Sequence, residues 1–130
     1  MTHRYTEWDS TPSIDRMVGL TFTRVLGQVG DDQMVFETDR ERFVFFHSQD
    51  CCESVAIDDI TGCLQDLVGE PLLRAEQVSG MTEPDAQHGE SYTYTFYKFA
   101  TRRGYVDVRW LGESNGYYSE SVSLGHQLNK

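Results

Sequence analysis

The stretch that decides the fold is the point where the most apolar run of the chain passes into its most polar loop, Phe43-Val44-Phe45-Phe46-His47-Ser48-Gln49-Asp50-Cys51-Cys52-Glu53-Ser54. The run over 42–47 predicts a strand that is apolar on both faces, which is typical of a central strand or of one covered by a second subunit. The loop over 47–54 gathers polar, chemically capable side chains where that strand ends, and loops placed by strands often carry function. This loop is therefore the first candidate site.

Further strands are predicted on both sides of this stretch by alternating apolar residues and by runs rich in aromatic and β-branched residues. The predicted strands are 20–29, 33–38, 42–47, 72–78, 91–101, 105–111 and 117–124. Turn residues separate several of them, as at Gly30-Asp31-Asp32. Consecutive hairpins of this kind favour an antiparallel sheet.

After the polar loop the spacing of the apolar residues changes from that of a strand to that of a helix. Apolar residues recur there at helical spacing, at Ile60, Leu64, Leu67 and Val68. Asp58 or Asp59 can cap the start of a helix, and Gly69 is well placed to end it. The spacing predicts one short helix over 59–68. The expected fold is therefore α+β, an antiparallel meander sheet of six or seven strands with one short helix inserted after the third strand.

The length and composition fit one domain. A chain of 130 residues buries roughly two thirds of its unfolded surface, and we expect a single domain over 14–124 between tails at 1–13 and 125–130. There is no run of about 18 apolar residues that would span a membrane, and the first residues lack the apolar stretch of a secretory signal. The expected compartment is the cytoplasm.

The charge balance argues against nucleic acid as a partner. With 21 acidic and 11 basic residues the formal net charge is −10, and such a surface repels the phosphate backbone that Lys and Arg would have to contact. A role as an acidic decoy for a basic partner stays open. The acids are scattered along the chain, however, so a solubilising surface is the favoured interpretation. We expect neither a duplex nor a membrane as partner.

The three cysteines predict neither a disulfide framework nor a metal site. Cys51 and Cys52 are adjacent, and neighbouring cysteines cannot bridge without strain, so we expect free thiols. His47, Asp50 and Glu53 beside them are legitimate metal ligands, but zinc sites usually place cysteines two to four residues apart. We therefore expect no metal and no cofactor, with one of the two cysteines buried as a small apolar residue.

Catalysis by the same loop is an alternative. Cys51 or Cys52 could act as a thiolate activated by His47. Four carboxylates would suit acid–base chemistry if they bracketed a substrate, namely Asp50, Glu53, Glu113 and Glu120. No nucleophile elbow surrounds either cysteine, and loop capping is the simpler interpretation of the carboxylates. We therefore favour a protein that is not an enzyme.

A second set of binding side chains belongs to the last predicted hairpin and its loop: Tyr97, Arg109, Trp110, Glu113, Ser114, Asn115, Tyr117 and Tyr118. Aromatic faces stack on bases, Arg pairs with phosphate, and Asn or Glu reads a base edge. Such a set can hold a nucleotide or a signal derived from one. Aromatic strands also build cores, so we expect Trp110 in the core, and Arg109 can instead pair with Asp107 or another acid.

Five strings of the sequence are distinctive: residues 46–55, Asp58-Asp59-Ile60, Leu64-x-Asp66-Leu67-x-Gly69-x-Pro71-Leu72, residues 95–101, and Arg109-Trp110-x-Gly112-Glu113-Ser114 with the six residues that follow. They lie within about 18–122. With them the chain resembles a family of small uncharacterised proteins common in bacteriophages and prophages. The resemblance implies a domain of unknown function in a phage or prophage accessory protein that acts inside a bacterium, and it carries no catalytic assignment.

The leading hypothesis is a non-enzymatic phage accessory protein that binds a small polar ligand. In its sharper form it is a counter-defence protein that sequesters a nucleotide-derived signal. The expected ligand-binding residues are His47, Asp50, Cys51, Glu53, Arg109, Glu113, Asn115 and Tyr117. The alternatives are a small hydrolase that uses His47, Asp50 and Glu53, with or without a metal, and an acidic interaction module that inhibits a host protein. The apolar excess of 42–46 is compatible with binding between subunits of a homo-oligomer.

Overall fold

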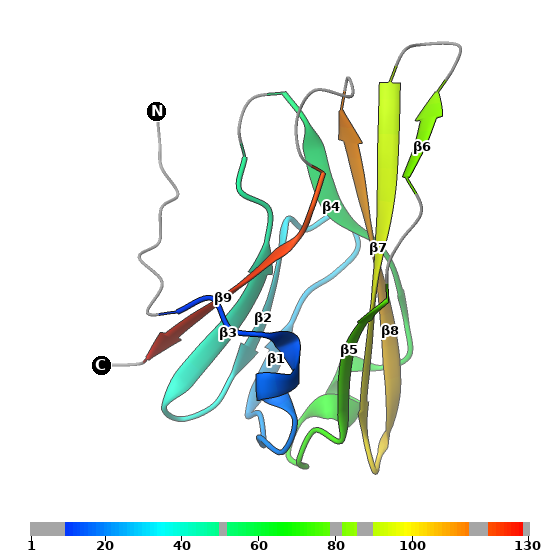
Figure 1. Ribbon diagram of the computed structural model, residues 1–130. Helices are drawn as coiled ribbons and strands as arrows, with labels where there is room; N and C mark the ends of the chain where they lie inside the picture. Colours follow the sequence, from blue (N-terminus) through cyan, green and yellow to red (C-terminus); the bar gives the residue numbers. More distant parts are fainter. Residues whose placement is uncertain (1–9, 50–51, 79–81, 86–89, 115–119, 129–130) are drawn as a thin grey trace.

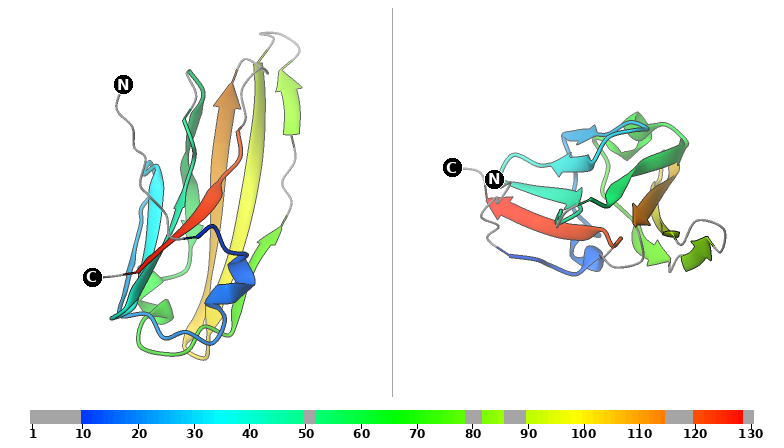
Figure 2. Two further views of the ribbon diagram at one scale, coloured as in Figure 1. Left: turned by 60° about the vertical axis from the view of Figure 1, so that its left-hand side comes forward. Right: turned by 90° about the horizontal axis from the view of Figure 1, so that it is seen from above.

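Two antiparallel sheets packed face to face make up the described chain, as the computed structural model shows (Figure 1). The structure describes residues 10–49, 52–78, 82–85, 90–114 and 120–128, and for 82–85 and 90–91 it describes the backbone alone. The two layers are visible in both views of Figure 2. Each sheet has one apolar face, and stacking these faces removes both from water.

The elements of the first sheet are β1 (Arg24–Leu26), β2 (Gln33–Glu37), β3 (Glu41–Phe46) and β9 (Ser123–Leu128). Those of the second sheet are β4 (Ser54–Thr61), β5 (Arg74–Val78), β6 (Thr82–Asp85), β7 (Glu90–Thr101) and β8 (Gly104–Ser114). Two short 3₁₀ helices, η1 (Ile14–Met17) and η2 (Leu64–Leu67), lie between strands. None of the helices in the described chain is long and apolar enough to cross a membrane.

The strand order shows how the chain moves between the layers. The first sheet runs β1-β2-β3-β9, and the second runs β4-β8-β7-β5, with β6 also paired to β7. The strand β3 therefore lies between β2 and β9 and is a central strand, one of the two possibilities expected for the run over 42–47. The last strand returns from the second sheet to the first, where Phe43 of β3 pairs with His126 of β9. Part of β9 thus falls in the stretch expected to be a C-terminal tail.

The core lies between the sheets and is dominated by aromatic rings. Phe36 of β2 and Phe45 of β3 have ring centroids 4.9 and 5.7 Å from that of Phe99 on β7. Such offset and edge-on contacts stabilise a core beyond the area that they bury. Trp110 of β8 is fully buried, as expected, and Tyr97 is 2% exposed. Burial raises the pKa of the Tyr97 phenol.

The expected α+β fold is wrong, because the described chain is nearly all-β, forms two sheets, and contains no α-helix. The helix predicted over 59–68 is replaced by the end of β4 and by η2. Val55 and Ile57 alternate inward along β4, and Gly62 then turns the chain with a φ of +104°. A side chain at Gly62 would collide with the Tyr105 carbonyl oxygen, so this glycine fits a turn and not a helix interior.

The expectation of one meander sheet is wrong for a separate reason. The chain leaves the first sheet after β3, builds the second sheet from β4 to β8, and returns with β9. Local alternation predicts where strands lie and which side chains share a face. It does not predict which strands pair across about eighty residues, as β3 and β9 do, because that choice depends on which apolar faces can cover each other.

Candidate functional site

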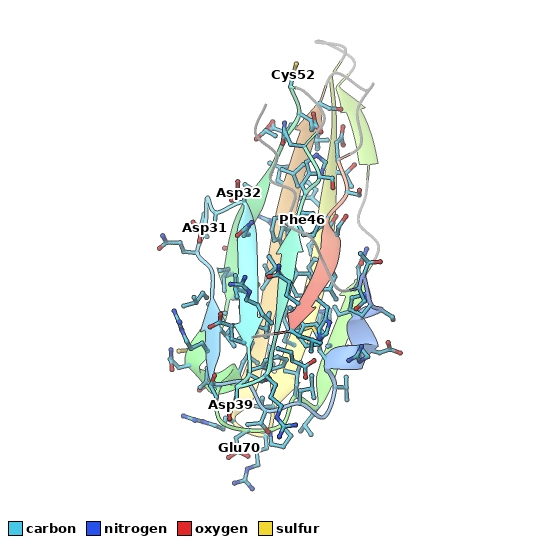
Figure 3. The ribbon with its side chains drawn as sticks, turned by 90° about the vertical axis from the view of Figure 1, so that its left-hand side faces the viewer. Asp31, Asp32, Asp39, Phe46, Cys52 and Glu70 are labelled. Atoms are coloured by element: carbon cyan, nitrogen blue, oxygen red, sulfur yellow. The ribbon has the colours of Figure 1, made fainter. Side chains whose placement is uncertain are left out.

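The polar loop buries the side chains at its two ends, His47 and Glu53, at one end of the sandwich, whereas Ser48, Gln49 and Cys52 between them are exposed. His47 follows β3 and Glu53 precedes β4, and the His47 Nε2 atom lies 2.7 Å from the Glu53 Oε2 atom. Their side chains are 4% and 0% exposed. Cys52, next to Glu53, marks this end of the molecule in Figure 3, and Asp39 and Glu70 mark the opposite end. The pair is therefore sealed from solvent.

The hydrogen bonds of His47 determine where its protons lie. Its Nδ1 atom is 2.7 Å from the carbonyl oxygen of Ser121, and because a carbonyl oxygen only accepts, Nδ1 must donate. The contact of Nε2 with Glu53 then requires one more proton, carried either by the ring as an imidazolium or by the Glu53 carboxyl group. Both ring nitrogens are thus engaged, and His47 ties β3, β4 and the segment before β9 together.

A second buried carboxylate lies at the same end. The Thr93 Oγ1 atom donates to Glu120 Oε1 at 2.7 Å, and the Ser114 Oγ atom donates to Glu120 Oε2. Glu120 is 8% exposed. A Cβ atom at Gly112 would lie 2.7 Å from both the Cβ and the carbonyl oxygen of Glu120, so glycine is needed for this close approach. We call His47, Glu53, Thr93, Ser114 and Glu120 the inner polar cluster.

The sulfur and metal chemistry of this region differs in part from the expectation. In the ranges that the structure describes, no group of three or more His, Cys, Asp and Glu side chains could hold a metal ion. Cys52 is exposed and disulfide-bonded, so the expectation of free thiols is wrong at that residue. Cys63 is an exposed free thiol. Cys51 lies outside the described residues.

A different set of side chains lies on the outward face of the second sheet. Tyr92, Tyr94 and Phe96 of β7 point outward because successive strand residues alternate, and Thr95 and Tyr97 between and beyond them are buried. Their ring centroids are 6.0 Å apart for the first pair and 6.3 Å apart for the second. We call these three residues the outer aromatic row. All three are half-buried, and no described element lies over this face in Figure 1.

Arg109 of β8 is held against the outer aromatic row. Its guanidinium carbon lies 5.3 Å from the centroid of the Tyr94 ring, which is a cation–π distance. Its Nε and Nη2 atoms lie 2.7 and 2.5 Å from Asp58 Oδ2. This hydrogen bond raises the pKa of the Arg109 guanidinium, which therefore stays charged. A register shift in β4 between Ile57 and Asp59 places both Asp58 and Asp59 opposite Arg109.

The structure divides the expected ligand-binding residues between these two places. His47 and Glu53 belong to the inner polar cluster, whereas Arg109 and Glu113 lie on the outward face of β8. The residues outside the described chain are Asp50, Cys51, Asn115 and Tyr117. The two predicted regions do meet, because β4 pairs with β8 from Ser54 and Glu113 onward. Their described side chains, however, point to opposite faces of the second sheet and do not form a single site.

Several functional candidates were missing from the sequence prediction. The outer aromatic row needs Tyr92 and Tyr94, and the position of Arg109 needs Asp58. The signal for the row was present, since the buried Trp110 and Val108 alternate with Arg109 in β8 and therefore imply that Arg109 faces outward. The partner of Arg109 depends on the bulge in β4, and alternation alone does not reveal a bulge.

The fold and the two places define an all-β sandwich domain with a buried polar end and an exposed aromatic face. The chain belongs to the family described as a domain of unknown function (DUF7448), whose model matches residues 15–124. Neither a curated protein nor a solved structure matches it.

Proposed function

We propose that the protein is a non-enzymatic binding module that holds a small polar ligand with a flat ring on the outer aromatic row. The observation that carries the proposal is the guanidinium of Arg109, 5.3 Å from the centroid of the Tyr94 ring, on a sheet face that the other described elements leave uncovered. Aromatic faces and a guanidinium plane are surfaces on which flat rings stack. Half-buried rings on rigid strands offer such stacking without a change of conformation.

The pairing of Arg109 with Asp58 supports the proposal because it fixes the guanidinium before a ligand arrives. A guanidinium has five N–H donors, and Asp58 engages those on Nε and Nη2, which leaves the Nη1 donors for a ligand. A group held by strands and by an ion pair loses little conformational entropy on binding. The face therefore combines a stacking surface with a directed hydrogen-bond donor.

The finer proposal is a bacteriophage accessory protein that sequesters a nucleotide-derived signal in the bacterial cytoplasm. Its phage context is supported by the resemblance of the five sequence strings, and the choice of ligand is supported by the stacking surface, which suits a nucleobase. The counter-defence role follows from that combination.

The small-hydrolase alternative has one observation in its favour, the 2.7 Å contact between His47 and Glu53. Both side chains are almost fully buried and both ring nitrogens of His47 are engaged. A general base must come within hydrogen-bond reach of its substrate, and this geometry offers no such approach.

The acidic-module alternative is supported by the net charge alone. Binding without catalysis is therefore the better-supported function.

The test is an NMR titration of the labelled protein with guanosine as a flat-ring probe. We expect amide shifts concentrated in β7 and β8. The Tyr94→Leu variant keeps apolar bulk but lacks the ring, and we expect it to bind guanosine about tenfold more weakly, as for the loss of one stacked base. The matched control is Tyr105→Ala, which removes an exposed tyrosine of β8 outside the row and should leave the affinity within about twofold.

Shifts confined to the sandwich end that holds the inner polar cluster would contradict this placement of the site. No shift at several millimolar guanosine would contradict ring binding itself. Native mass spectrometry of the same protein, purified from bacterial cells, tests the finer proposal. A nucleotide-sized adduct that is lost in Tyr94→Leu supports it, and an adduct that Tyr94→Leu retains counts against it.

A further inference from the structure

The outward face of the second sheet carries more acidic than basic side chains among the described residues. The strands β4, β5, β7 and β8 carry three basic residues, and each faces an acid. Arg109 pairs with Asp58 at 2.5 Å, and Arg74 pairs with Glu76 at 2.5 Å. The third, Lys98, lies 3.7 Å from Asp107. Every basic side chain on these strands is therefore already matched by a carboxylate.

Two further carboxylates lie on the same face, in addition to those of the three pairs. Asp59 of β4 and Glu113 of β8 are both exposed. Asp59 lies opposite Arg109 and its charge helps to raise the pKa of that guanidinium, whereas Glu113 forms no ion pair with any described residue. In the register Glu113 lies opposite Tyr92. Glu113 thus lies beside the outer aromatic row at its Tyr92 end, whereas β8 with Arg109 separates Asp59 from the row. The face carries net negative charge next to its stacking surface.

The rings add to this bias. An aromatic ring presents negative potential on its faces, which is why a cation lies favourably over it. Arg109 over Tyr94 is an instance of this preference in the molecule itself. The net charge of −10 also favours the approach of a cationic ligand over that of an anionic one. A phosphate near this row would meet the carboxylate of Glu113, and Arg109, the basic side chain beside the row on these strands, is already paired with Asp58.

We infer that the ring bound by this face is positively charged, such as a ring-alkylated purine or another cationic heteroaromatic, and that phosphorylated rings are rejected. This inference rests on the proposed function, in which a flat ring binds the outer aromatic row, and it argues against the finer proposal for any nucleotide-derived signal that carries a phosphate. Cation–π attraction to the row and the charge of Glu113 act together on the same ligand ring. The inference assigns Glu113 the role of selecting the charge of the ligand, whereas Tyr94 supplies stacking to any flat ring.

The experiment compares three ligands that share one ring system by calorimetric titration: guanosine, 7-methylguanosine and guanosine 5′-monophosphate. The first is neutral, the second carries a positive charge on the ring, and the third carries a phosphate. We expect 7-methylguanosine to bind about tenfold more tightly than guanosine, and the monophosphate to bind more weakly than either. In Glu113→Gln the ratio of the 7-methylguanosine affinity to the guanosine affinity should fall severalfold. In the charge-matched control Glu76→Gln, which loses the carboxylate beside Arg74, the preference should stay.

Equal binding of all three ligands, or tightest binding of the monophosphate, would overturn the inference. If the ligands bind without this charge preference but guanosine binding still depends on Tyr94, the proposed function stands and only the inference about the charge of the ligand fails. If none of the three ligands binds, both fail together. A preference for 7-methylguanosine that survives in Glu113→Gln and in a Glu113→Gln, Asp59→Asn double variant would also overturn it, because the rings alone would then select the charge.

Discussion

The inner polar cluster and the outer aromatic row lie on opposite faces of the same two strands. Near one end of β7 and β8, Thr93 and Ser114 point into the sandwich, whereas Tyr92 and Tyr94 point outward. An antiparallel sheet usually has its apolar face on the core and its polar face toward water. These two strands therefore reverse the usual pattern at the end where the candidate sites lie.

The difference between the two places lies in burial and in partners more than in residue type. In the inner polar cluster, His47, Glu53 and Glu120 are buried and each is bonded to a neighbour. A satisfied polar network fixes a structure but has no capacity left for a ligand. The outer aromatic row is half-buried, and Glu113 beside it is exposed. The same kind of side chain thus stabilises the fold at Glu53 and is available for binding at Glu113.

The largest expected effect on stability comes from Glu53→Ala, and the matched substitution Glu113→Ala tests the contrast between the two places. Glu53→Ala leaves the Nε2 atom of His47 buried without its partner, which should cost roughly 3 kcal/mol of unfolding free energy. For a chain of this length, that lowers Tm by about 10 °C. Glu113→Ala removes an exposed carboxylate and should change Tm by less than about 2 °C. Differential scanning calorimetry measures both.

The Glu53→Gln variant sharpens this comparison. The Gln amide can donate to Nε2 of a neutral His47 while Nδ1 still donates to Ser121, so we expect it to recover most of the stability lost in Glu53→Ala. A Tm equally low in both variants would mean that the pair needs its charge. Equal losses in Glu53→Ala and Glu113→Ala would remove the distinction between a structural and a binding carboxylate.

Much of the local structure could be predicted from the sequence. The strands expected over 33–38, 42–47, 91–101 and 105–111 correspond to β2, β3, β7 and β8, and the antiparallel hairpins are confirmed. Val106, Val108 and Trp110 are buried and alternate with the outward-facing Arg109, as a strand over 105–111 requires. These features depend on neighbours along the chain. The pairing of β9 with β3 does not, since it joins residues about eighty positions apart, and the two-sheet fold could not be predicted without it.

The candidate site was predictable only as a set of segments. Polar residues at the end of a strand suggest a solvent-exposed loop, so Glu53 and Glu113 look alike in the sequence. Their separation depends on the chain entering β4 with Glu53 on the same side as Val55, which is the inward side. The role of Ile60, Leu64 and Leu67 was misread for a related reason. These three apolar residues at helical spacing also fit a strand end followed by one 3₁₀ turn.

A smaller loss of stability is expected when the inner polar cluster loses one hydrogen-bond donor. Ser114→Ala removes one of the two hydroxyl groups that donate to Glu120 and should cost about 1.5 kcal/mol, because hydrogen bonds to buried charged groups exceed the average. The matched control is Ser54→Ala, an exposed serine of the adjacent strand β4, with no expected change. Urea unfolding monitored by tryptophan fluorescence gives both values. Equal stability of Ser114→Ala and the wild type would show that Glu120 is held by Thr93 and its other contacts.

The smallest effect on stability, and the one that most directly tests the outer aromatic row, comes from Asp58→Asn. This ion pair is partly exposed, with side chains 42% exposed for Arg109 and 30% for Asp58, and such pairs contribute little, so Tm should move by less than about 2 °C. The affinity for guanosine should nevertheless fall severalfold, because Arg109 is no longer fixed over Tyr94. Asp107→Asn makes the same change of charge beside Lys98 and should leave the affinity within about twofold.

Comparing the guanosine affinity of these two variants shows whether binding depends on the position of Arg109 or on the net charge of the face. If Asp58→Asn and Asp107→Asn change guanosine affinity equally, only the net charge of the face matters and the placement of Arg109 is incidental. If Asp58→Asn alone weakens binding, the bulge in β4 is a functional feature, because it brings Asp58 opposite Arg109. The outer aromatic row would then depend on a carboxylate of the neighbouring strand in the way that the inner polar cluster depends on Glu53, with the difference that its loss removes binding and leaves the fold intact.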